Sequence, residues 1–124
     1  NWLASAELGE ILGRPATLRV ADLAALRPMV RFDEVERRLG RGAPTEGPVT
    51  IYIYVSEDRK VDYWFWFFPV DVQAKSRWSP ENLGLYLVSR GGDGPILWPE
   101  ALVGRDLKSV FEEYARAHPG LERR

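Results

Sequence analysis

Six consecutive aromatic residues, Tyr63 to Phe68, make up the most apolar stretch of the chain. A helix would spread these rings around its whole circumference, whereas a strand sends alternate rings to opposite faces of a sheet. We therefore expect a strand that has an aromatic surface on each face. One surface can belong to the core, and the other needs a second layer of structure or a partner.

A second alternating segment lies just before the aromatic one. Residues 49–55 read Val-Thr-Ile-Tyr-Ile-Tyr-Val, and the polar segment 56–60 that follows is typical of a hairpin loop. The sequence therefore predicts two antiparallel strands, near 49–55 and 61–70.

The pairing of these strands decides which side chains share a face. We expect Val55 to pair with Val61, which places Ile53 beside Tyr63. This register collects aliphatic side chains on one face. It collects rings that mostly carry hydroxyl or indole groups on the other: Tyr52, Tyr54, Trp64, Trp66 and Phe68. A single-residue slip or bulge would destroy the sorting.

Two further strands are expected near 83–89 and 96–98, separated by a glycine-rich turn. In the first of them the leucines at 83, 85 and 87 alternate with other residues and should share a face. The connecting segment 71–82 is polar apart from Val72 and Trp78. We expect it to cover part of the sheet or to reach a partner.

A helix is predicted over 106–118, because Asp106 is a suitable N-cap and apolar residues follow at helical spacing. Its apolar stripe consists of Leu107, Val110, Phe111 and Tyr114. The stripe should pack on one face of the sheet.

The amino-terminal third predicts short helices that are interrupted by Pro and Gly. One pattern spans residues 3–12, another follows Asp22, and a third opens at Asp33, which with Glu36 resembles a capping box. Residues 40–48 are rich in Gly and Pro and read as an internal loop. The fold class is therefore α+β. We expect one domain over 1–124, with a helical part at 1–39 and the sheet and last helix at 49–124.

Composition excludes several classes of function. The chain has no cysteine, so thiolate metal sites and cysteine nucleophiles are impossible. Its 17 basic and 18 acidic side chains are evenly spread, which argues against nucleic acid as a partner. No apolar run reaches the roughly 20 residues of a transmembrane helix. Cytoplasmic residence is the default expectation, and the scarcity of Asn, Gln, Met and Cys would suit a thermophilic source.

Catalytic signatures are not found. The single histidine, His118, lies at a predicted helix end, where a cation interacts well with the helix dipole. Asp62 is the most interesting carboxylate, since the expected register places it opposite Tyr54, where burial would raise its pKa. We expect no metal and no cofactor, and we expect the protein not to be an enzyme.

Three functions are open from these patterns. The first is a non-catalytic accessory or adaptor subunit that docks on a larger protein complex, or forms a homo-oligomer, through the Tyr/Trp face. The second is a small apolar-ligand binding protein, and the third is a carboxylate-dependent hydrolase. The partner-binding candidates are Tyr52, Tyr54, Trp64, Trp66, Phe68 and Trp78. An equally open structural alternative is that the protein's own helices cover this face.

Overall fold

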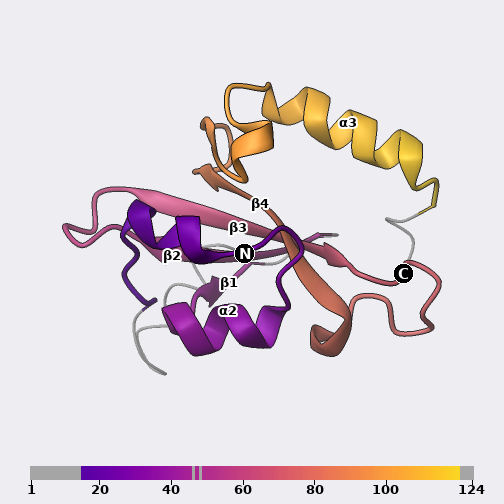
Figure 1. Cartoon of the computed structure of the whole chain (residues 1–124), viewed down its shortest axis with the longest axis horizontal. Coiled ribbons are helices and arrows are strands. Elements are labelled where there is room, and N and C mark those ends of the chain that lie inside the picture. Colours follow the sequence, from indigo (N-terminus) through magenta and orange to yellow (C-terminus); the bar gives the residue numbers. More distant parts are fainter. Residues whose placement is uncertain (1–14, 46, 48, 121–124) are drawn as a thin grey trace.

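The protein is an α+β fold in which helices flank an antiparallel sheet. The computed structural model describes residues 15–45, 47 and 49–120. Helix α2 lies on one side of the sheet and helix α3 on the other (Figure 1). The helical segments are η1 (Val20–Ala25), α2 (Phe32–Leu39), η2 (Pro80–Asn82), η3 (Glu100–Leu102) and α3 (Leu107–Ala117). The helix expected over residues 3–12 falls outside the described residues.

Five strands form the sheet, in the spatial order β1-β2-β3-β4-β5, with every neighbouring pair antiparallel. They are β1 (Ala43–Pro44), β2 (Thr50–Val55), β3 (Asp62–Pro69), β4 (Leu83–Arg90) and β5 (Ile96–Trp98). Four of them were expected. The fifth, β1, lies in the Gly/Pro-rich segment that was interpreted as a loop, and a proline is tolerated there because the strand is at the sheet edge.

The expected register of β2 and β3 is wrong by one residue. Val55 pairs with Asp62 and not with Val61, and Ile53 pairs with Trp64. The hairpin loop is one residue shorter than expected. Ser56 and Val61 close it with a backbone hydrogen bond, from Ser56 N to Val61 O at 2.9 Å. Residues that pair directly share a face, so the slip mixes the two predicted sets of side chains.

Polar side chains hold this tighter turn in place. The Ser56 hydroxyl donates to Asp58 Oδ1 at 2.6 Å, and the same oxygen accepts the Lys60 amide at 3.0 Å. Arg59 has a φ of 62°, which reverses the chain within four loop residues.

A β-bulge changes the faces of β4 as well. Trp66 pairs with Leu87 and Phe67 pairs with Leu85, so Tyr86 is an additional residue on β4. Leu85 therefore shares a face with Phe67, while Leu87 lies on the opposite face with Trp66. The expectation that all three leucines of this strand share a face is wrong for this reason.

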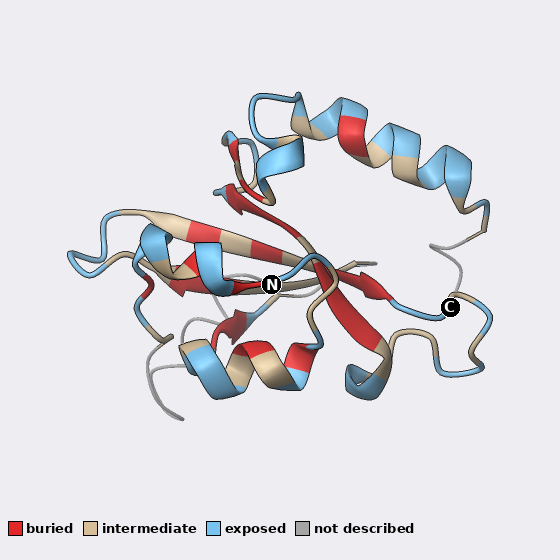
Figure 2. Cartoon of the chain, in the orientation of Figure 1, coloured by how far each residue is buried: buried red, intermediate tan, exposed pale blue. Residues whose placement is uncertain are grey.

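The face of the sheet toward α2 carries the larger core. Phe65, Phe67 and Val88 from the sheet are fully buried there and pack with Leu23 of η1 and Val35 of α2. Figure 2 shows that buried positions concentrate along the strands, with exposed positions on the outer sides of the helices. The amino-terminal helical segments thus form a layer on the same sheet.

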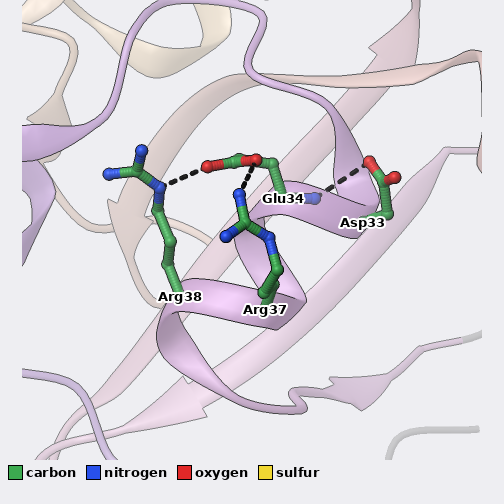
Figure 3. A network of polar contacts seen from close by, with 4 residues as sticks. All are labelled: Asp33, Glu34, Arg37 and Arg38. Carbon is green, nitrogen blue, oxygen red and sulfur yellow. Dashed lines mark hydrogen bonds and ion pairs between the residues drawn. The ribbon is translucent and has the colours of Figure 1, made fainter.

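Helix α2 starts earlier than the capping-box interpretation predicted. Its N-cap is Arg31, which makes no side-chain cap, and Asp33 lies within the first turn. Asp33 Oδ1 accepts the Glu34 amide at 2.9 Å, and the Glu34 carboxylate bridges Arg37 and Arg38 on the helix surface (Figure 3). The hydrogen bond from Arg38, with a second from Arg37, lowers the pKa of Glu34. The expected end at Gly40 is confirmed, with a φ of 85°.

Both long edges of the central strands are occupied. On the outer side of β2, Leu18 N donates to Val55 O at 2.7 Å, beside the pairing with β1. On the outer side of β4, Leu85 N donates to Val30 O at 2.8 Å, beside the pairing with β5. Among the described strands, the outermost are the short β1 and β5, which limits the addition of a strand from another chain.

Helix α3 begins as expected. Asp106 accepts the Ser109 amide at 3.0 Å through Oδ2, which makes it the N-cap. Val110 is the one fully buried residue of the helix and packs with Leu87 and Ile96 of the sheet. Within the described part of the chain, no helix comes near the length that a bilayer crossing requires, since α3 has 11 residues.

Candidate functional site

A half-open cavity of about 220 Å³ lies between helix α3 and the sheet. Its lining is almost wholly apolar and comes from four parts of the chain: Val49, Trp66, Phe68, Trp78, Phe111, Tyr114 and Ala115. None of the described residues in this lining carries a carboxylate, amine, guanidinium or imidazole group. Any occupant would therefore be held by apolar and ring contacts.

The floor of the cavity is a product of strand periodicity. Trp66 and Phe68 are two residues apart on β3 and point to the same face, while Phe67 between them points into the core near α2. Val49 directly precedes β2, two residues before Ile51, which pairs with Trp66. Consecutive aromatic residues can thus supply both a core and a cavity floor.

The roof is a product of helix periodicity. Phe111, Tyr114 and Ala115 are spaced i, i+3 and i+4 on α3 and so lie on one side of the helix. Trp78, from the segment between β3 and η2, completes the wall. Ala115 lines the cavity and is exposed, so we expect a larger side chain at this position to narrow the cavity.

Contacts between the rings hold the lining in place. The Phe68 and Tyr114 rings are stacked with centroids 4.4 Å apart, and the Trp66 and Phe111 rings are 4.6 Å apart. Phe68 also lies 6.1 Å from the Trp78 ring. These pairs join the floor to the roof and to the wall, and such ring pairs contribute beyond the area they bury.

The indole N–H of Trp66 makes its hydrogen bond to a residue that does not line the cavity. Its Nε1 donates to Ser89 Oγ at 2.9 Å, and that hydroxyl donates to Gly91 O at 2.7 Å. Ser89 is completely buried on β4, so these two hydrogen bonds hold the indole ring of Trp66 in place against β4. The cavity therefore meets the apolar surface of Trp66.

Tyr114 is the residue of the described lining whose pKa is shifted. Burial, and secondly the neighbouring Tyr86, raises the pKa of Tyr114 to about 12. The His118 ring stacks on the Tyr114 ring at 4.2 Å, and its Nδ1 lies 3.1 Å from Tyr114 O. Tyr114 is thus a neutral phenol at ordinary pH.

The structure divides the six predicted site residues between two faces. Trp66, Phe68 and Trp78 line the cavity. Trp64 lies beside them, with its ring 5.8 Å from that of Trp66.

Tyr52 and Tyr54 lie on the opposite face, toward α2, so the expectation that they share a face with the tryptophans is wrong. Tyr52 packs against Phe32 at 4.8 Å. Tyr54 is 1% exposed, and its hydroxyl donates to Gly40 O at 2.7 Å. Tyr54 is thus buried in the core on this side, whereas Tyr52 is half-buried, and burial raises the pKa of both phenols.

Comparison with known proteins identifies no relative. No family model matches the chain, and neither the curated proteins nor the solved structures contain a significant match. The interpretation of the site therefore depends on its geometry.

The other candidate residues lie away from the cavity lining. Asp62 pairs with Val55 and not with Tyr54, so its expected position is wrong, although partial burial raises its pKa. His118 is the C-cap of α3 and reaches the lining only through its stacking on Tyr114. Among the residues that the structure describes, no three acidic or histidine side chains gather as a potential metal site.

Four lining residues were not among the predicted site residues: Val49, Phe111, Tyr114 and Ala115. The apolar stripe on α3 was recognised from its spacing, but it was interpreted as core. The sequence carries one signal that could have identified it: the stripe includes two large rings next to a residue as small as Ala115.

Proposed function

We propose that this protein is a non-catalytic binding protein whose cavity beneath α3 takes a small apolar ligand. The observation that supports this most directly is a preformed cavity with five aromatic side chains in its lining, where the Tyr114 phenol is the one ionisable group among the described residues. Binding sites for small molecules are typically concave, apolar and largely preformed. A rigid lining reduces the ordering that binding requires.

The size of the cavity supports a small occupant. A dry apolar cavity of about 150 Å³ binds benzene, and this cavity is larger, at about 220 Å³. A ligand of about ten heavy atoms would bind with a Kd of the order of 0.1–1 mM, at roughly 0.5 kcal/mol per atom. A helix or strand of a partner would not fit, whereas a ring or a short alkyl chain would.

The accessory-subunit prediction loses the feature that motivated it. Its docking surface required Tyr52 and Tyr54 beside the tryptophans, but both tyrosines lie on the other face of the sheet, where they pack in the core next to α2. The occupied edges of β2 and β4 also limit association by strand addition. The proposal therefore assigns the aromatic residues of β3 to ligand binding.

The third function, a carboxylate-dependent hydrolase, has less support. Asp62 is the carboxylate of interest, but it does not line the cavity, and none of the described lining residues is an acid that could perform general acid–base chemistry. The proposal accordingly assigns no catalytic residue.

A matched pair of α3 variants tests the proposal. Ala115 lines the cavity and Ala117 does not, and both are exposed on the same helix. Titration with 3-phenylpropan-1-ol, followed by NMR, should show binding to the wild type and to Ala117→Phe. Ala115→Phe should lose at least tenfold in affinity because its ring occupies the opening. Equal binding by both variants, or none by the wild type, would contradict the proposal.

A further inference from the structure

A second hollow adjoins the cavity along the same side of α3. It has a volume of about 570 Å³ and shares Trp66, Phe111 and Ala115 with the first. Its other lining residues are Gly92, Asp93, Asp106, Leu107, Lys108 and Glu112. The two hollows meet at these three residues, where the Trp66 and Phe111 rings lie 4.6 Å apart. Together they extend along α3 from its carboxyl-terminal half to its amino-terminal end, and we call this surface the groove.

The two parts of this groove differ in charge. Among the described residues, those that line the aromatic part carry no charge, whereas those that line the second part supply three carboxylates and one ammonium group, that of Lys108. Asp106 is engaged as the N-cap, where its hydrogen bonds to Ser109 lower its pKa and keep it ionised. Asp93 and Glu112 lie on the turn after β4 and on α3, and they face this part of the groove from two elements.

The turn that carries Asp93 is held against the aromatic residues of β3. A Cβ at Gly92 would lie 3.1 Å from the Trp64 ring, so a glycine allows this close approach. The carboxylate of Asp93 follows directly in the chain. The position of the acidic part is thus fixed by the same strand that supplies the cavity floor.

We propose that the ligand is an amphipathic cation, with its apolar group in the aromatic cavity and its ammonium group beyond Phe111, near Asp93 and Glu112. This inference rests on the proposed function and specifies the ligand class. Complementary charge favours a cation over a neutral analogue, and the faces of the neighbouring rings add a favourable cation–π contribution. An anion of the same shape is disfavoured by the same carboxylates.

Three probes of one shape test this inference: 3-phenylpropylammonium, 3-phenylpropan-1-ol and 3-phenylpropionate. At low salt we expect the ammonium to bind about two- to fivefold more tightly than the alcohol, a factor typical of exposed charge pairs. The carboxylate should bind most weakly. In 0.5 M salt the three affinities should converge because the exposed charges are screened.

Charge-removing variants assign the preference to particular side chains. Glu112→Gln and Asp93→Asn should each reduce the preference for the ammonium and leave the affinity for the alcohol unchanged. Glu113→Gln is the matched control, because Glu113 pairs with Arg105 and is not part of the groove lining. It should retain the preference.

The outcomes separate the inference from the proposed function. Equal binding of all three probes would overturn the inference and leave the apolar site intact. A preference that persists in both groove variants would overturn the assignment to Asp93 and Glu112. Binding of none of the probes would contradict the proposed function itself.

Discussion

Phe68 on the sheet and Tyr114 on α3 stack at 4.4 Å, with 30° between their ring planes. This contact joins the floor of the cavity to its roof. It also explains how α3 can lie over a void and still be held in place, since the rings on both sides of the void contact each other.

Truncation of Tyr114 should be costly, whereas loss of its hydroxyl should not. Tyr114→Ala removes the stacking on Phe68 and exposes the cavity, and we expect a loss of about 2–3 kcal/mol in the free energy of unfolding, somewhat less than for a fully buried ring. Tyr114→Phe keeps the ring and should cost less than about 1 kcal/mol. Chemical denaturation measures both values. Equal stability of the two variants would show that the stacking contributes little.

The raised pKa of Tyr114 predicts a loss of stability in alkali. The folded state holds this proton more tightly than the unfolded state, because its pKa is about 12 against an ordinary 10.0. The contribution is fully present below pH 10 and is lost as the pH rises from 10 to 12. The wild type should therefore lose stability relative to Tyr114→Phe across that window. A stability difference that stays constant up to pH 12 would contradict the burial of this phenol.

Ser89, the buried serine that accepts a hydrogen bond from Trp66, should contribute to both stability and ligand binding. Ser89→Ala removes the acceptor of Trp66 Nε1 and the donor to Gly91 O. We expect a cost of about 1–3 kcal/mol in unfolding free energy, because buried polar atoms are left without partners. The indole also loses its anchor, so probe binding should weaken. Unchanged affinity in a folded Ser89→Ala variant would show that the ring is held by packing alone.

The tyrosine on the opposite face provides the contrasting case. Tyr54→Phe removes the hydrogen bond to Gly40 O and should cost about 1–2 kcal/mol in unfolding free energy. It should leave probe binding unchanged, because Tyr54 lies on the α2 side of the sheet. A loss of binding at constant stability would indicate that both tyrosines and tryptophans belong to one surface, as the expected register would have required.

Much of the fold could be predicted from local signals. The alternation in β2, the aromatic strand β3, the cap at Asp106 and the stripe on α3 are all properties of neighbouring residues, and the structure confirms them. The length of the hairpin loop could not be read in the same way. It depends on side-chain hydrogen bonds within the turn, from Ser56 to Asp58, and a change of one loop residue moves every ring on one strand to the other face.

The candidate site was predicted only in part, for the same reason. Trp66, Phe68 and Trp78 were recognised from their chemistry, but the roof depends on where α3 crosses the sheet. That crossing is set by contacts between residues far apart in the chain, such as Trp66 with Phe111. The bulge at Tyr86, which brings Leu87 to the α3 side, is likewise a tertiary feature with no local signal in the sequence.

Intermolecular NOEs between 3-phenylpropan-1-ol and the protein test the central claim most directly, because they locate the bound ring. The account predicts NOEs from the phenyl protons to Phe68, Trp78 and Phe111, which line three sides of the cavity. These NOEs should disappear in Ala115→Phe and persist in Ala117→Phe. NOEs to residues outside the cavity lining, or none at saturating probe, would contradict it.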